Sequence, residues 1–96
     1  MRVIRSYPLP IADTQTITLP EDSNFLSVQT TLETPDVPVL FVMHDEPEAE
    51  TILHQYTIRM MGTDSQIDDD TKLSHIATIQ IRGRTFALHV FEEWGE

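Results

Sequence analysis

β-structure is indicated most clearly by Thr14-Gln15-Thr16-Ile17-Thr18-Leu19, which alternates with a period of two residues. Its β-branched side chains favour the pleated, half-buried surface of a strand. The same alternation returns between Ile52 and Met61. Both segments are therefore predicted to be strands, and one face of the second carries Ile52, His54, Tyr56, Ile58 and Met60.

Turn residues separate these strands from further ones. Pro20 to Asn24 is a cluster of turn formers, and a strand is predicted after it from Phe25 to Leu32. The segment Val39-Leu40-Phe41-Val42-Met43 is apolar at every position, which predicts a strand that is covered on both faces. Another strand is expected near the N-terminus, from Arg2 to Tyr7.

The last third of the chain predicts a β-hairpin. Strands are expected from Ile76 to Ile81 and from Thr85 to Phe91, joined by Arg82-Gly83-Arg84 with Gly83 supplying a positive φ. The whole pattern predicts an all-β single domain over residues 1–96, a small sandwich or barrel of six or seven mainly antiparallel strands. Pro47 to Gln55 leaves room for one short helix.

Composition excludes several classes of site. The chain has no cysteine, so it has no disulfides, zinc-thiolate sites or cysteine nucleophiles. No run approaches the ~18 consecutive apolar residues of a membrane-spanning helix, and Met1 to Arg5 is no start of a signal peptide. We therefore expect a soluble intracellular protein without a membrane partner.

Charge is distributed unevenly along the chain. The formal net charge is −10, and no lysine or arginine occurs from Ser6 to Ile58, where nine carboxylates lie. Nucleic-acid-binding proteins normally present a basic stripe, so direct binding of DNA or RNA is not expected. A field of one sign selects partners of the other sign, which predicts a protein partner with a basic surface. The predicted contact residues are Asp45, Glu46, Glu48 and Glu50.

Patterns typical of catalysis are missing. The sequence has no nucleophile elbow and no glycine-rich phosphate loop. Glu92 and Glu93 are adjacent, and adjacent residues of a strand point to opposite faces, so they are not expected to act as an acid–base pair. The loop from Asp64 to Asp70 lacks the glycine and terminal glutamate of a calcium loop. We expect a protein that is not an enzyme and binds no cofactor.

The four histidines show no H-x-H spacing, which strands use to place two ligands on one face. The sequence therefore predicts no metal site. His54 and His89 are expected to be part-buried strand residues, and His44 and His75 to lie at strand ends.

Two further groups of residues are candidates for binding. Arg59, Arg82 and Arg84 are candidates for holding a phosphate or carboxylate, because arginine donates paired hydrogen bonds to such groups. Phe91 and Trp94 are candidates for self-association, since aromatic side chains bury much area at low entropic cost. Exposed strand edges add to that expectation, and a homodimer is predicted.

Short motifs spread over nearly the whole chain carry a resemblance: Tyr7-Pro8-Leu9, Gln15, Leu19-Pro20, Leu26-Ser27-Val28-Gln29, Pro38-x-Leu40, Gly62-Thr63 and His89-Val90-Phe91-Glu92. On these motifs the chain resembles a family of small proteins of unknown function encoded by tailed bacteriophages and prophages. The family usually has a tryptophan where Phe41 stands, and a glycine and a histidine where this chain has Asp64-Ser65. A ligand role for that loop therefore does not carry over.

The resemblance implies a phage origin rather than an activity. It favours a non-enzymatic binding protein in the cytoplasm of the bacterial host, an inhibitor of a host defence protein in the manner of anti-CRISPR proteins, acting through its acidic surface. One alternative is an oligomeric sponge that sequesters a small anionic nucleotide messenger. Another is a minor virion or assembly component. The identity of the target stays open.

Overall fold

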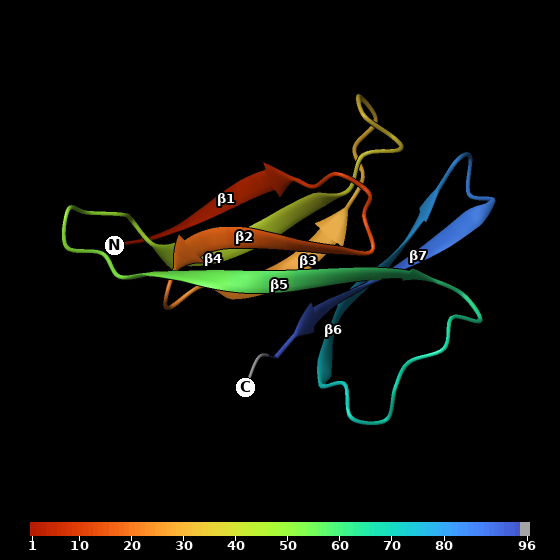
Figure 1. Ribbon diagram of the computed structural model, residues 1–96. Coiled ribbons are helices and arrows are strands. Elements are labelled where there is room, and N and C mark those ends of the chain that lie inside the picture. The colour runs from red at the N-terminus through yellow and green to blue at the C-terminus, as the bar shows by residue number, and fades with distance from the viewer. Residues whose placement is uncertain (95–96) are drawn as a thin grey trace.

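Two antiparallel β-sheets pack face to face in the computed structural model, which describes residues 1–94 (Figure 1). The all-β prediction is confirmed, and the described residues contain no helix, hence none long and apolar enough to cross a membrane. They form seven strands: β1 (Arg2–Pro8), β2 (Thr14–Pro20), β3 (Asn24–Gln29), β4 (Val39–Asp45), β5 (Leu53–Gly62), β6 (Leu73–Ile81) and β7 (Phe86–Glu93).

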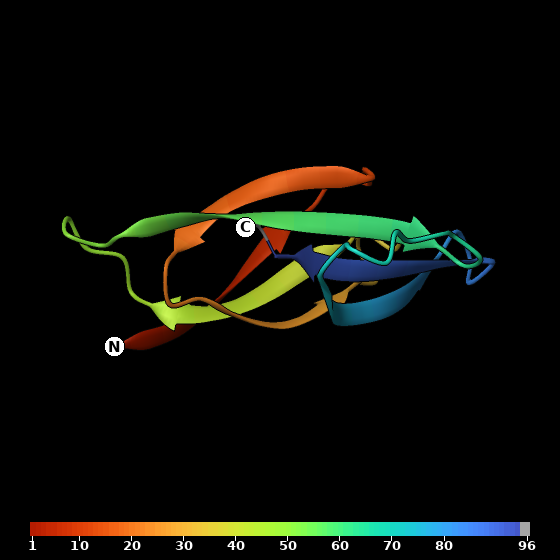
Figure 2. The same ribbon diagram turned by 60° about the horizontal axis from the view of Figure 1, so that its bottom comes forward.

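The strands divide into a three-stranded sheet with the order β1-β4-β3 and a four-stranded sheet with the order β2-β5-β7-β6. Every hydrogen-bonded pair is antiparallel. Figure 2 shows the sheets as two layers. The molecule is flat, with extents of 43 × 37 × 16 Å. Packed sheets lie about 10 Å apart, so this thickness holds one layer of side chains between them.

The core consists of that single layer. Leu40 and Val42 of β4 face Ile58 of β5 and Val90 of β7, and all four side chains are fully buried. Burying one such side chain contributes about 1.5–3 kcal/mol. The two-residue period of the strands is what brings these residues to the inner faces and sends the intervening polar ones to the surface.

β4 is fully covered on one face only. Its alternate residues Val39, Phe41 and Met43 are half-buried on the outer face of the three-stranded sheet. A two-sheet architecture supplies no third layer, so these side chains are shielded by neighbours on the adjacent strands, such as Ile4 opposite Met43. The expectation of a strand covered on both faces is therefore wrong.

The segment from Pro47 to Gln55 does not form the short helix for which it left room. The backbone N–H of Glu48 donates to the Thr51 hydroxyl at 2.7 Å, and the N–H of Thr51 donates to the Glu48 carbonyl at 3.1 Å. Only Ile52 separates this closed turn from Leu53, the first residue of β5. The turn and the strand together use the residues that a helix would need.

β-bulges interrupt both β3 and β6. The register shifts between Phe25 and Ser27 in β3, and between His75 and Ala77 in β6, so Leu26 and Ile76 are the extra residues. A bulge breaks the two-residue period, which explains why β6 begins at Leu73 rather than at the predicted Ile76. β3 also ends earlier than predicted, at Gln29.

The β6–β7 hairpin ends in three successive residues with positive φ: Arg82 (54°), Gly83 (68°) and Arg84 (69°). The positive φ predicted for Gly83 is confirmed. The backbone N–H of Arg82 donates to the Asp36 carboxylate at 2.6 Å, and its guanidinium lies 5.6 Å from the centre of the Phe86 ring. The hairpin tip is thereby held against the β3–β4 loop.

The histidines differ from their expected positions. His44 lies near the end of β4, as predicted, but it is 1% exposed and belongs to the interior. Its position two residues after Val42 places it on the inner face. His54 is exposed instead of part-buried, and His75 lies within β6 beside the bulge. His89 is half-buried, as predicted.

Candidate functional site

A cleft of about 890 Å³ opens between the sheets where β5 begins and β7 ends. Its walls come from β3, β5, β6, β7 and the β2–β3 turn. Pockets for ligands occupy about 300–1,000 Å³, so the cleft has the size of a binding site. Both bulge residues, Leu26 and Ile76, line it, and bulges are frequent beside functional sites because they redirect side chains.

Aromatic rings form part of the cleft wall. The rings of Phe25 and Tyr56 meet edge to face with centroids 5.1 Å apart, and the His54 ring meets Tyr56 in the same way at 4.7 Å. The Tyr56 hydroxyl donates to the Glu21 carbonyl at 2.8 Å, which fixes the ring against the β2–β3 turn. Trp94 lines the opening and is 58% exposed.

Carboxylates supply the charge of the cleft. Glu21, Glu92 and Glu93 contribute to its lining, and the described lining residues include no lysine or arginine. Partial burial raises the pKa of the Glu92 carboxyl above its usual 4.5, while His54 nearby acts in the opposite direction. Burial and the negative charge of Glu92 together raise the pKa of the Tyr56 hydroxyl above 10.0. The cleft is therefore an anionic environment.

Glu92 and Glu93 diverge, as the sequence predicts for adjacent strand residues. Glu92 lies opposite the buried Ile58 and faces the inside of the sandwich. Glu93 instead forms an ion pair with Arg59, at 2.5 Å, on the outer side of the four-stranded sheet. Glu92 takes part in no salt bridge among the described residues.

Among residues 1–94, one edge of β5 has no partner strand beside the cleft. The last pair between β5 and β7 is Thr57 with Glu93, and β5 continues for Leu53 to Tyr56 before it. In the described chain, no strand pairs with these four residues on the β7 side, although β2 pairs with them on the other side. Figure 1 shows β7 ending midway along β5. The backbone of an unpaired edge presents free donors and acceptors.

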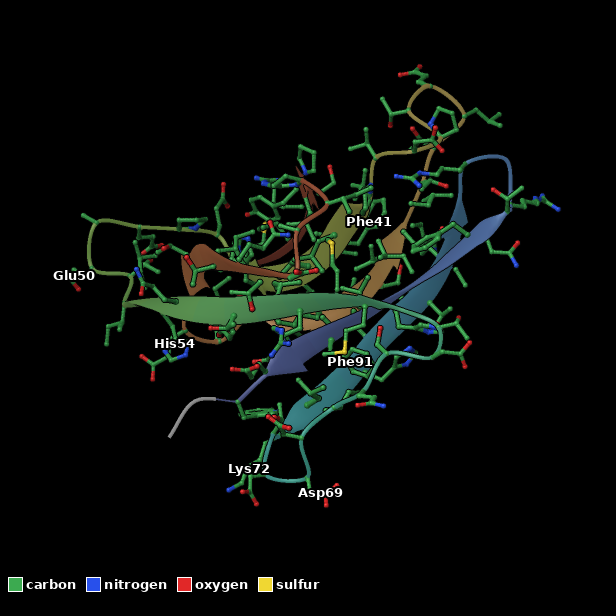
Figure 3. The ribbon with its side chains drawn as sticks, turned by 45° about the vertical axis from the view of Figure 1, so that its right-hand side comes forward. Phe41, Glu50, His54, Asp69, Lys72 and Phe91 are labelled. Atoms are coloured by element: carbon green, nitrogen blue, oxygen red, sulfur yellow. The ribbon has the colours of Figure 1, made fainter. Side chains whose placement is uncertain are left out.

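The predicted partner-contact residues lie close to this region. Asp45 ends β4, opposite Arg2 of β1, and the exposed Glu46, Glu48 and Glu50 lie in the loop that leads into β5. Figure 3 shows Glu50 and His54 on the same side of the molecule.

The β2–β3 turn joins the loop to the cleft, because the N–H of Glu21 donates to the carbonyl of Ile52 at 2.9 Å. The loop, the turn and the cleft together form a surface that we call the acidic end. Its carboxylates, apart from Glu93 in its ion pair with Arg59, are Glu46, Glu48, Glu50, Glu21, Asp22 and Glu92.

The three candidate arginines do not converge within one chain. Arg59 lies opposite Phe91, and its side chain contacts Glu93 and the Asp13 carbonyl. Arg82 and Arg84 lie at the hairpin tip that precedes Phe86, and Phe86 is five residues before Phe91 in β7. At about 3.4 Å per residue these positions are some 17 Å apart.

The candidate self-association residues lie in different surroundings. Phe91 is half-buried on the outer side of the four-stranded sheet, where its ring meets that of His75 at 5.3 Å. Trp94 follows the end of β7 and borders the cleft, and its backbone N–H donates to the Lys72 carbonyl at 2.9 Å. The homodimer remains a prediction.

Two histidines share a hydrogen-bonded row on the outer side of the four-stranded sheet. The Thr78 hydroxyl lies 2.9 Å from Nε2 of His75 and 3.0 Å from Nδ1 of His89, and Nε2 of His89 lies 3.0 Å from the Thr63 hydroxyl. Each of the two imidazoles is thus hydrogen-bonded to at least one threonine hydroxyl. Within residues 1–94, no group of three or more side chains has the arrangement to hold a metal ion.

A second hollow, of about 440 Å³, lies between the β1–β2 and β3–β4 loops. It is lined by residues 8–11 and 36–38 and is mainly apolar. Its charged residue, Asp36, is bound to the hairpin tip. The hollow therefore presents fewer polar groups to a ligand than the cleft does.

The sequence contained part of the signal for the cleft. The two-residue period placed His54 and Tyr56 on the same face of the predicted strand as Ile58. Phe25, Glu92 and Trp94 join them only through the register of β7 with β5 and the packing of β3. A local sequence pattern contains no information on the register of β7 with β5 or on the packing of β3.

The comparisons with known proteins give a family without a known activity. No curated protein and no solved structure matches the chain. A family model described as a domain of unknown function (DUF7352) matches residues 1–96. The chain therefore belongs to the DUF7352 family, whose function is unknown.

Proposed function

We propose that this chain is a non-enzymatic binding protein that recognises a positively charged protein through its acidic end. The observation that carries the proposal is the continuity of the anionic loop with a ligand-sized cleft that no lysine or arginine lines among the described residues. Oppositely charged surfaces attract and orient each other during diffusion, so the loop would speed association. The aromatic walls of the cleft would slow dissociation, because buried aromatic anchors dominate binding energy.

Few cationic side chains of the described chain pair with the carboxylates of the acidic end. The salt bridge among residues 1–94 joins Arg59 to Glu93, on the outer side of the four-stranded sheet. Desolvating an unpaired carboxylate is costly, so a partner that covers the acidic end must bring its own cations. This requirement selects a basic surface over a neutral one.

Within this proposal the partner is a protein of a bacterial host, and the chain acts as a phage-encoded inhibitor, for instance of a defence protein. The support is the resemblance of the motifs from Tyr7-Pro8-Leu9 to His89-Val90-Phe91-Glu92 to small phage proteins. Small phage proteins outside the virion commonly act by binding host machinery.

The test starts with affinity purification from the host and identification of the captured protein by mass spectrometry. Association rates with that purified protein are then measured at low and physiological salt. Reversing Glu46, Glu48 and Glu50 to lysine should slow association strongly, and added salt should slow association of the wild type. Equal rates for the variant and the wild type at both salt concentrations would contradict the proposal.

A matched control is the reversal of Asp68, Asp69 and Asp70 to lysine. These residues lie in the β5–β6 loop, outside the acidic end, and the change in net charge is the same. We expect the control to slow association much less than the first variant. Equal slowing would show that net charge rather than the acidic end attracts the partner.

A further inference from the structure

The open edge of β5 and the cleft form one site. His54, Gln55, Tyr56 and Thr57 are consecutive and all line the cleft, although alternate side chains of a strand point to opposite faces. The cleft therefore wraps around the edge of the strand. Leu53 to Tyr56 span about 13 Å at ~3.3 Å per residue, which is room for a short extended peptide.

The surroundings of this edge suit cationic side chains. Glu92 lies near the end of β7, next to the open edge of β5. The rings of Phe25, Tyr56 and Trp94 line the cleft together with Glu92. A guanidinium pairs with a carboxylate through charge-assisted hydrogen bonds and also packs on aromatic faces. An acidic ligand would meet the carboxylates of Glu21, Glu92 and Glu93 there, and no lysine or arginine among the described lining residues.

We infer that an extended, arginine-containing segment of the partner binds in the cleft as an added strand on the open edge of β5. This inference rests on the proposed function and specifies how its acidic end is used. The backbone of the segment pairs with residues 53–56, as β7 does with the rest of β5. Arginines at alternate positions point inward to Glu92 and the aromatic rings, because side chains of the added strand also alternate.

A synthetic hexapeptide of alternating arginine and valine, capped at both ends, serves as the probe. Trp94 is the single tryptophan of the chain and lines the cleft, so its fluorescence reports occupancy. We expect saturable binding, with NMR shift changes centred on the amides of residues 53–57. A peptide with glutamate in place of arginine should not bind. Equal binding of the two peptides would overturn the inference.

Two changes separate the roles of charge and backbone. Glu92→Gln should weaken binding of the arginine peptide about tenfold, because it removes one charge-assisted pair. The control Asp69→Asn, in the exposed β5–β6 loop outside the acidic end, should leave the affinity within about twofold. A peptide with alternate amides N-methylated cannot pair as a strand and should not bind. Unchanged affinity for Glu92→Gln, or full binding of the methylated peptide, would overturn the inference.

Simple counter-ion binding is tested with arginine amide and spermidine. Both carry cations but neither can form a strand, so we expect them to bind much more weakly than the peptide. Equal affinity would overturn strand addition. A chain ending at Trp94 should bind the peptide at least as well as residues 1–96, and loss of binding would place the contact outside the cleft.

Failure of strand addition in the cleft can be distinguished from failure of the proposed function by comparing the loop reversal with Glu92→Gln. If the loop reversal slows association with the purified host protein but Glu92→Gln does not weaken that complex, the partner contacts the loop of the acidic end and not the cleft. The proposed function would then stand and the inference would fail. If neither change has an effect, both fail.

Discussion

At the scale of single residues, His44 is the clearest case of a polar group held inside the core. Its Nε2 accepts a hydrogen bond from the Tyr7 hydroxyl at 3.0 Å, and its Nδ1 donates to the Asp45 carbonyl at 2.7 Å. Both ring nitrogens are therefore satisfied, as a buried polar side chain requires. In the sequence, His44 follows Leu40 and Val42 at two-residue spacing, so its burial on the same face of the strand could be predicted. Its hydrogen bond with Tyr7 could not, because β1 lies far away in the sequence.

Replacing His44 by alanine should lower the free energy of unfolding by about 2–5 kcal/mol, because it removes a fully buried side chain and leaves a cavity. Tyr7→Phe removes only the hydroxyl and should cost about 1 kcal/mol. Urea denaturation of both single variants and the double variant measures these values and their coupling. A cost for His44→Ala no larger than that for Tyr7→Phe would contradict the packing role.

Glu92 should make stability depend on pH. Its pKa is raised in the folded protein by burial, so between pH 4.5 and the raised pKa the folded state binds more protons than the unfolded state. Stability contributed by this group is therefore present at low pH and lost as the pH rises through that window. Glu92→Gln should be more stable than the wild type at pH 7, by less than about 1 kcal/mol because the group is partly exposed.

Urea denaturation of Glu92→Gln and the wild type from pH 4 to pH 7 checks this expectation. The difference between the two should shrink toward pH 4. Glu50→Gln, in the exposed loop, controls for the loss of one negative charge. A wild type that is more stable than Glu92→Gln at pH 7 would show that the carboxylate has a counter-ion.

At the scale of elements, the strands were predictable and the defects in them were not. The period of two residues identified β2 and β5, an unbroken apolar run identified β4, and turn residues marked the limits of others. The bulges at Leu26 and Ile76 depend on register with β4 and β7, which lie elsewhere in the sequence. The cleft depends on the same register, since it opens where the β5–β7 pairing stops at Thr57.

The hairpin tip gives a test at this scale. Gly83 has a φ of +68°, and a Cβ added there would meet no heavy atom within 4 Å. Gly83→Ala should therefore destabilise the protein by about 1 kcal/mol through backbone conformation alone. Thermal unfolding measures the loss.

Gly62→Ala is the matched comparison, because its Cβ would lie 3.2 Å from the Phe86 ring and its φ is not positive. Its cost should fall when Phe86 is also replaced by leucine, whereas the cost of Gly83→Ala should not. A Gly83→Ala variant as stable as the wild type would mean that the tip adopts another conformation.

At the scale of the whole molecule, charge opposes folding. A formal net charge of −10 on a flat molecule 16 Å thick places like charges near one another on both faces. Screening lengths fall from about 30 Å at 0.01 M salt to about 8 Å at 0.15 M. The melting temperature should therefore rise by several degrees with sodium chloride over this range.

Asp68, Asp69 and Asp70 provide the control for this expectation. Replacing all three by asparagine removes three negative charges from an exposed loop, so the melting temperature should depend less on salt. Calorimetry in sodium chloride measures both proteins, because sulfate would stabilise them by exclusion from the surface. A wild type that is destabilised by salt would show that ion pairs outweigh repulsion.

The interleaved strand order has a consequence for synthesis. β1 pairs with β4, and β2 pairs with β5, so the first two strands leave the ribosome well before their partners exist. Among the seven described strands, the pairs that are neighbours in sequence are β3 with β4 and β6 with β7. Such non-local pairing makes folding slow and leaves strand edges exposed in nascent chains. Mutual repulsion between carboxylates then keeps unfinished chains apart, so the acidic surplus protects the protein before it has a fold.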